Sequence, residues 1–169
     1  MKRNLPPSSL PPVRARSPRE RPQPAVLVAQ TQIGRGVLAN RDFPAGANVG
    51  AIRGRVIADP DYGSDYAIDI GAGLSLEPVA PFRFLNHSCE PNCGLVVYEE
   101  EDDDGVIHGR EVVLEALRPI AIGEELTIDY AWGADSAIPC GCGAPNCRRW
   151  VICEEELADF LKSTDAAPA

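Results

Sequence analysis

The chain has 169 residues, 44% of them hydrophobic, and a formal net charge of −9. This length suits one domain, and no apolar run approaches the ~18 residues of a membrane span. The acidic balance disfavours direct binding to nucleic acid and favours cationic partners such as basic peptides, although acidic residues also simply confer solubility. We therefore expect no membrane, no direct nucleic-acid contact, and a monomer.

The first 24 residues differ in composition from the rest of the chain. They contain seven of the sixteen prolines, and six basic residues against one acidic residue, which leaves the remainder at −14. Such a segment cannot bury enough apolar surface to offset its loss of conformational entropy. We expect residues 1–24 to form a disordered tail.

From residue 25 onward, short apolar runs are separated by Gly and Pro, which is typical of a mostly β protein. The expected strands are Ala25–Gln30, Gly36–Ala39, Asn48–Ile52, Tyr66–Ile70, Leu95–Tyr98, Val106–Leu117 and Leu126–Tyr130. The acidic run Glu99–Asp104 predicts a solvated loop tip between two strands. Only Glu154–Lys162 has helical spacing of its apolar residues, so we expect one short C-terminal helix and no doubly wound nucleotide-binding fold.

Cysteines near the C-terminus are spaced as metal ligands. Cys140, Cys142 and Cys147 form a C-x-C-x4-C cluster that is one ligand short of a tetrahedral zinc site. Cys89 is the best fourth donor, and we do not expect the nearby His87 to bind the metal. An iron–sulfur cluster or redox pair is the rival interpretation, but C-x-C is a poor redox spacing. The tight spacing and the lack of a signal sequence predict a reducing, cytoplasmic location.

Four motifs follow one another along the chain. They are Gly34-Arg35-Gly36, the ten residues from Arg83 to Asn92, the segment from Gly123 to Tyr130, and the cysteine cluster. Together they resemble the SET-domain protein lysine methyltransferases, over about residues 25–151. The resemblance implies a fold of several small sheets in which the Asn-His segment passes beneath a later strand as a pseudoknot. It also implies S-adenosylmethionine as methyl donor and one structural zinc in a post-SET tail.

The resemblance divides the chain into a SET domain at residues 25–133, a post-SET zinc segment at 134–152, and a helix with a tail at 153–169. It makes Tyr130 the catalytic hydroxyl and Tyr66 a wall of the lysine channel. The residues implied to bind the cofactor are Gly34, Arg35, Gly36, Arg83, Asn86, His87 and Trp150. The zinc ligands are Cys89, Cys140, Cys142 and Cys147.

Several of these residues have a plainer interpretation. A Gly-x-Gly is most often a tight turn, and a tyrosine at a strand end often has its ring in the core and its hydroxyl in water. Arg83 either contacts the cofactor or, as we favour, pairs with an acid such as Glu125. Trp150 either contacts the adenine or packs, whereas packing is favoured for Trp132.

Position 128 departs from the family pattern, because many members have Tyr or Phe where this chain has Ile128. A tyrosine hydroxyl there can hold a water molecule in the space of a second methyl group. Ile128 cannot hold that water and is smaller, so we expect products beyond monomethyl-lysine.

The sequence therefore predicts a methyltransferase that acts on a lysine of a basic protein, either a histone or a histone-like or ribosomal protein. The alternative is a catalytically silent SET domain that serves as a protein-binding module. A silent member would be expected to lose Tyr130, the Gly-x-Gly turn or the Asn-His pair. All three are present, which favours the enzyme.

Overall fold

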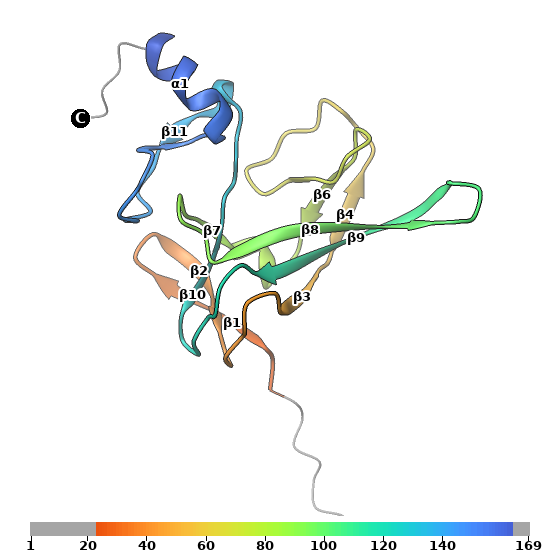
Figure 1. Ribbon diagram of the computed structural model, residues 1–169, viewed down its shortest axis with the longest axis horizontal. Helices are drawn as coiled ribbons and strands as arrows, with labels where there is room; N and C mark the ends of the chain where they lie inside the picture. The colour runs from red at the N-terminus through yellow and green to blue at the C-terminus, as the bar shows by residue number, and fades with distance from the viewer. Residues whose placement is uncertain (1–22, 164–169) are drawn as a thin grey trace, which may run out of the picture.

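The structure is a computed structural model that describes residues 23–163 and consists mainly of short strands (Figure 1). Residues 1–22, which make up most of the predicted disordered tail, lie outside the described residues. Within residues 23–163, no helix is long and apolar enough to span a membrane.

The described strands form four small sheets. The first contains, in order, β1 (Val26–Thr31), β2 (Gly34–Ala39), β10 (Glu125–Ile128) and β7 (Asn86–His87). The second contains β3 (Asn48–Ile52), β9 (Ile107–Ala116) and β8 (Cys93–Glu101). The third contains β4 (Gly54–Ile57), β6 (Ser75–Pro78) and β5 (Ile68–Asp69). The fourth pairs β11 (Ile138–Pro139) with β12 (Trp150–Val151).

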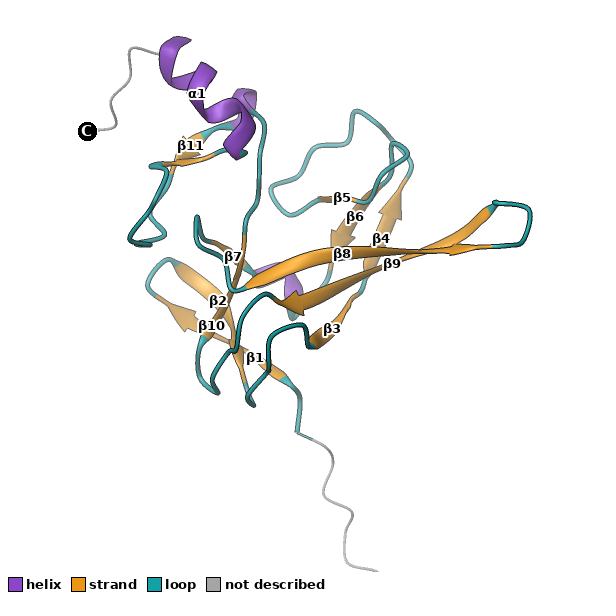
Figure 2. Cartoon of the chain, in the orientation of Figure 1, coloured by secondary structure: helices purple, strands orange, loops and turns teal. Residues whose placement is uncertain are grey.

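Helical structure is limited to short segments, as Figure 2 shows. Two 3-10 helices cover Phe82–Phe84 and Ala134–Ser136, and the α-helix α1 covers Glu154–Ser163. The helix predicted at Glu154–Lys162 is thus present, and so is the mostly β fold of several small sheets.

The core lies where the first two sheets meet. Val37 of β2, Leu126 of β10 and Leu114 of β9 have no exposed surface. Each of these burials stabilises the fold by roughly 1.5–3 kcal/mol relative to an exposed side chain. The packing fixes β10, and β10 leads directly to Tyr130.

Parallel pairing brings two of the sequence motifs together. β7 pairs with β10, so that Asn86 lies opposite Thr127 and His87 opposite Ile128. The buried side chain of Asn92 donates to the carbonyl of Glu125 at 2.8 Å and accepts the N–H of Thr127 at 2.8 Å. The Asn-His segment and the later strand therefore lie side by side, as the resemblance implied.

Two predicted strands extend beyond the observed ones, and the strand predicted at Leu95–Tyr98 was too short, since β8 covers Cys93–Glu101. The strand expected at Tyr66–Ile70 is limited to β5, since the N–H groups of Tyr66 and Ala67 bond back to Ser64 at 3.2 and 3.1 Å. The strand expected at Leu126–Tyr130 ends at Ile128.

The acidic run also differs from its prediction as a loop tip. Its first half, Glu99–Glu101, belongs to β8, and the turn begins at Asp102, whose side chain accepts N–H groups of Asp104 and Val106. β8 and β9 form a long hairpin that extends away from the other sheets (Figure 1).

Candidate functional site

The predicted catalytic residue, Tyr130, lies two residues beyond the end of β10. Its hydroxyl donates a hydrogen bond to the carbonyl oxygen of Leu85 at 2.7 Å. Its ring lies between those of His87 and Trp132, with centroids 5.4 and 5.2 Å away. Burial, with smaller contributions from Tyr66 and Asp65, raises the pKa of Tyr130, so the hydroxyl keeps its proton at neutral pH.

A narrow cavity of about 40 Å³ lies beside Tyr130. Most of its wall is apolar or aromatic: Tyr66, Ile68, Phe82, Leu85, Ile128, Tyr130 and Trp132. Tyr66, predicted as a wall of the lysine channel, lines this cavity, and so does Ile128. The small volume and mostly apolar lining of this cavity suit an extended methylene chain.

A second cavity, of about 290 Å³, adjoins the first and shares Tyr66, Tyr130 and Trp132 with it. Arg35, Arg83 and Asn86, three of the predicted cofactor residues, line it. Gly34 and Gly36 flank Arg35 on β2 without lining the cavity. The volume is near the lower end of small-molecule pockets, which start at roughly 300 Å³.

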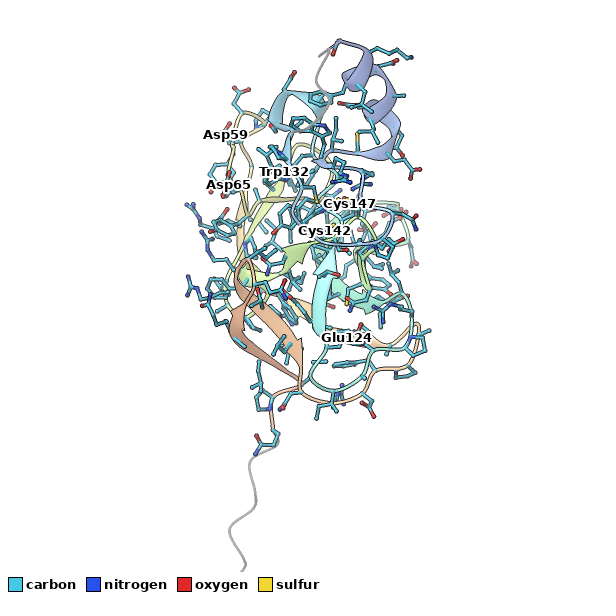
Figure 3. The ribbon with its side chains drawn as sticks, turned by 90° about the vertical axis from the view of Figure 1, so that its left-hand side faces the viewer. Asp59, Asp65, Glu124, Trp132, Cys142 and Cys147 are labelled. Carbon is cyan, nitrogen blue, oxygen red and sulfur yellow. The ribbon has the colours of Figure 1, made fainter. Side chains whose placement is uncertain are left out.

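A third hollow, of about 650 Å³, also borders the narrow cavity and shares Asp65, Ala67 and Trp132 with it. None of the described residues that line this groove is basic, and its charged side chains are Asp65 and Asp69. In Figure 3, Asp65 and Trp132 lie on the same side of the molecule. The narrow cavity thus adjoins both an acidic groove and the pocket lined by Arg35 and Arg83.

Arg83 supports the channel wall rather than pairing with Glu125. Its guanidinium bonds to Glu77 and lies over the Tyr66 ring, 3.8 Å from the centroid. Arg83 thus pairs with an acid, as favoured, but the partner is Glu77 of β6 and not Glu125, the acid named as an example. The Arg83 hydrogen bond and charge lower the pKa of Glu77 despite the opposing effect of burial, which keeps the pair ionised.

Glu125 instead accepts a hydrogen bond from Asn86 Nδ2 at 2.7 Å. The same nitrogen donates to the carbonyl of Arg35 at 3.2 Å, so Asn86 joins β7 to both β2 and β10. A Cβ on Gly36 would lie 2.4 Å from Glu125 Oε1 and 3.0 Å from Asn86 Nδ2. Gly36 is therefore required by the packing of this pair, a close approach that no side chain permits.

The four predicted zinc ligands come together. The Sγ atoms of Cys89, Cys140, Cys142 and Cys147 all lie within 4.8 Å of one another. Cys89 Sγ is 3.7 Å from that of Cys140 and 3.9 Å from that of Cys147. Four thiolates at about 2.3 Å around a tetrahedral zinc would be about 3.8 Å apart, so the cluster fits one zinc ion. Figure 3 shows Cys142 and Cys147 between the C-terminal helix and the sheets.

Hydrogen bonds favour the thiolate form of one of these cysteines, Cys142. Burial opposes ionisation of Cys142, but N–H groups of Cys89 and Ala144 outweigh it and lower the pKa of Cys142 to about 7. The thiolate is the form that binds metals. For Cys89, burial is the largest effect and raises its pKa.

His87 was predicted on the cofactor side through the backbone of the Asn-His segment. Its side chain bridges the cysteine cluster and Tyr130. Its Nδ1 accepts the backbone N–H of Tyr130 at 3.2 Å, and Nε2 lies 3.4 Å from Cys89 Sγ. Burial lowers the pKa of His87, so the ring is neutral and its proton, assigned from these partners, is on Nε2. Nδ1 also lies 3.4 Å from Asp129, but without a proton there it forms no ion pair.

Trp150, the last predicted cofactor residue, packs in the C-terminal segment. Its ring meets that of Phe160 in α1 edge-on, with centroids 5.1 Å apart, and it lines none of the three cavities above. Its Nε1 is buried and has no hydrogen-bond partner among the described residues. Of the two interpretations of Trp150, this arrangement favours packing.

Sequence reasoning missed an ion pair next to both the cysteines and the tyrosine. Arg148 follows Cys147, Asp129 precedes Tyr130, and their side chains form two hydrogen bonds of 2.7 Å. The signal that could have found this pair is position in the chain, since Arg148 is adjacent to a predicted zinc ligand and Asp129 is adjacent to the predicted catalytic residue. Asp65, at the junction of the three cavities, was missed as well.

Comparison with known proteins identifies the family. The SET-domain family model matches residues 34–131, and the chain belongs to this family. Over 72 residues it is 42% identical to histone-lysine N-methyltransferase trr of Drosophila melanogaster, covering 41% of this chain and 3% of that protein. Over 72 residues it is 46% identical to histone-lysine N-methyltransferase 2B of Homo sapiens, covering 41% of this chain and 2% of that protein.

The chain thus spans only 3% and 2% of the length of these two relatives. Among solved structures, it is similar to KRYPTONITE in its complex with mCHH DNA, an H3(1-15) peptide and SAH. The TM-score is 0.63 at 28% identity, covering 79% of this chain and 30% of that one. The predicted SET-domain fold is confirmed, and the C-terminal cysteine cluster fits a post-SET zinc site.

Proposed function

We propose that the chain is a protein-lysine N-methyltransferase that uses S-adenosylmethionine and acts on a basic protein, either a histone or a histone-like or ribosomal protein. The observation that carries this proposal is the position of Tyr130, which lines the narrow cavity, and this cavity shares lining residues with two larger ones. The similarity to histone-lysine methyltransferases and to a structure that contains SAH and an H3 peptide supports it.

The pocket of about 290 Å³ is the proposed cofactor site, with Arg35, Arg83 and Asn86 in its wall. S-adenosylmethionine would supply an electrophilic methyl group on a positively charged sulfur. As the lysine nitrogen bonded to the methyl carbon, the sulfur would leave with the electron pair of the sulfur–carbon bond. The four cysteines would hold the zinc, which would supply a cross-link between residue 89 and residues 140–147.

The protein's part in this reaction is to align and desolvate the lysine. The apolar wall of the narrow cavity favours the neutral amine over the ammonium, and only the neutral amine has the lone pair for the reaction. The proton of the Tyr130 hydroxyl is committed to the Leu85 carbonyl, so its oxygen is left to accept a hydrogen bond from the amine. Arg83 holds the Tyr66 ring in place on the cavity wall. Alignment of this kind accounts for much of the rate of a displacement reaction.

The groove of about 650 Å³ suits an extended basic peptide. Its lining includes Asp69 of β5 and Ile138 of β11. Within the described residues β5 pairs only with β6, and β11 only with β12, so each has a free edge to which an extended peptide can add. The carboxylates of Asp65 and Asp69 favour cationic side chains next to the lysine.

The test is incubation of the full chain, prepared with zinc, with labelled S-adenosylmethionine and separate pools of core histones and basic ribosomal proteins. Label on lysine that disappears in the Tyr130→Phe variant supports the proposal. Retention of a basic protein on the immobilised chain without any labelling would support the silent binding module instead.

A further inference from the structure

Arg148 connects the cysteine loop to the strand that ends beside the catalytic residue. Its Nη1 and Nη2 each donate to one carboxylate oxygen of Asp129, both at 2.7 Å. The Arg148 side chain is only 13% exposed and that of Asp129 29%. A bidentate pair of this kind fixes the relative orientation of the guanidinium and the carboxylate, which a single contact between point charges does not.

Asp129 in turn fixes the backbone of Ala131, the residue that follows Tyr130. Its Oδ1 accepts the N–H of Ala131 at 3.0 Å, and Ala131 has a φ of +46°, a left-handed conformation that alanine rarely adopts. The turn directs the chain from Tyr130 to Trp132, and both side chains line the proposed cofactor pocket and the narrow cavity. A shift of Asp129 would therefore move two walls of the site.

The ion pair is held firmly in its ionised form. Burial opposes the charge on Asp129, but hydrogen bonds from Arg148 outweigh it and keep the pKa of Asp129 below its ordinary value. Arg148 and Asp129 are thus both charged at neutral pH.

We propose that Arg148 is a positioning residue whose bond to Asp129 makes metal binding at the four cysteines and methyl-donor binding beside Tyr130 depend on each other. The inference rests on the proposed function for the identity of the donor. Zinc orders the loop that carries Arg148, Arg148 holds Asp129, and Asp129 sets the turn between Tyr130 and Trp132. Because coupling between two sites is reciprocal, a ligand in the cofactor pocket also raises the affinity for zinc by the same factor.

The experiment measures SAH affinity by calorimetry, with zinc bound and after its removal by a chelator, in the wild type and in Arg148→Lys. In the wild type, zinc removal should weaken SAH binding about tenfold, within the range of typical coupling between sites. Arg148→Lys keeps the positive charge but loses the bidentate hydrogen bonding to Asp129. With zinc bound it should already bind SAH more weakly, and zinc removal should change its affinity by less than about twofold.

A matched control is available on the β8–β9 hairpin. Arg110 has the same 13% side-chain exposure as Arg148 and pairs with Glu99 at 2.8 Å, away from the cavities. Arg110→Lys should keep the full wild-type coupling. Zinc affinity, measured by competition with a chelator at equilibrium, is a second readout that requires no turnover. SAH should raise it about tenfold in the wild type and in Arg110→Lys, but not in Arg148→Lys.

Asp129→Asn tests the same link from the strand, away from the cysteine ligands, and keeps the inference testable if Arg148→Lys fails to load zinc. Asp129→Asn should lose the coupling between zinc and SAH binding, as Arg148→Lys does. The variant with both substitutions should lose no more of this coupling than either single variant. Full wild-type coupling in Asp129→Asn or in zinc-loaded Arg148→Lys would overturn the inference and leave the proposed function intact. A wild type that binds SAH equally with and without zinc would overturn it too, whereas a zinc-loaded wild type that binds no SAH would overturn both.

Discussion

The hydroxyl of Tyr130 donates its single proton to the carbonyl of Leu85, the residue just before the Asn-His segment, at 2.7 Å. This bond fixes the ring beside the narrow cavity and leaves the oxygen lone pairs free for a substrate. It also satisfies a carbonyl on a buried residue. One interaction therefore has both a structural and a chemical consequence.

Replacement of Tyr130 by Phe should separate these two consequences. The ring stays packed between His87 and Trp132, so the fold and the SAH affinity should be largely retained. The lost hydrogen bond at Leu85 should lower the free energy of unfolding by about 1 kcal/mol. Turnover should fall by more than about tenfold, because the loss falls on the chemical step. Single-turnover rates and urea denaturation measure both effects, and unchanged turnover would argue for a binding module.

Removal of the metal should disorder the C-terminal loop. Cys142→Ser should abolish stoichiometric zinc, because it removes one of four ligands, while Cys153→Ser should keep it, since Cys153 is outside the cluster. Elemental analysis of reduced protein and hydrogen exchange over residues 139–150 are the measurements. Equal zinc content in the two variants would show that the four thiols are not the site.

Gly36→Ala should destabilise the fold by about 1–3 kcal/mol, because the new methyl group would overlap Glu125 Oε1 and Thr31 Cγ2. Gly63→Ala is the matched control, since a Cβ there would have no atom within 4 Å. The midpoint of urea unfolding compares the two. A similar midpoint for both variants would show that the Asn86–Glu125 pair moves aside at no cost.

The groove carboxylates should select cationic peptides. Asp69→Asn should raise KM for a basic peptide by about twofold to fivefold at low salt, with kcat unchanged, and the effect should shrink as salt increases. Asp103→Asn, on the hairpin turn outside the groove, should leave KM unchanged. Loss of affinity in both variants would point to net charge instead of the groove.

Ile128 should determine how many methyl groups are added. Ile128 lines the narrow cavity and has no hydroxyl, so we expect di- or trimethyl-lysine among the products. Ile128→Tyr should restrict the product to monomethyl-lysine, whereas Ile128→Leu should not, because it nearly conserves volume. Mass spectra over a time course, with excess donor, distinguish these products. A wild type that stops at one methyl group would show that another side chain, such as Tyr66, fills the space.

The sequence predicted those parts of the site whose residues are close together in the chain. Cys140, Cys142 and Cys147 are within eight residues of one another, so their spacing alone predicts a shared metal. The family motifs gave Cys89 and Tyr130. Two-residue strands such as β5 and β12 are too short for any periodicity, which is why β5 was predicted too long and β12 was not predicted.

Pairings between distant side chains could not be predicted in the same way. Glu125 pairs with Asn86 because β7 lies beside β10, and that pairing depends on the whole fold. Arg83 and Glu77 are only six residues apart, but they meet because the chain turns between β6 and the 3-10 helix, which no sequence pattern showed. Arg148 and Asp129 are 19 residues apart on segments with no shared pattern. The side chain of His87 faces the cysteines, which its motif did not show.

The most direct test of the central claim is quantitative mass spectrometry of lysine-containing basic peptides incubated with the zinc-loaded full chain and S-adenosylmethionine. The SAH released is measured in parallel. The account predicts methyl groups on lysine side chains, one SAH for each methyl group transferred, and almost no product with Tyr130→Phe. Peptide that binds the chain but gains no methyl group, with no SAH released, would contradict it.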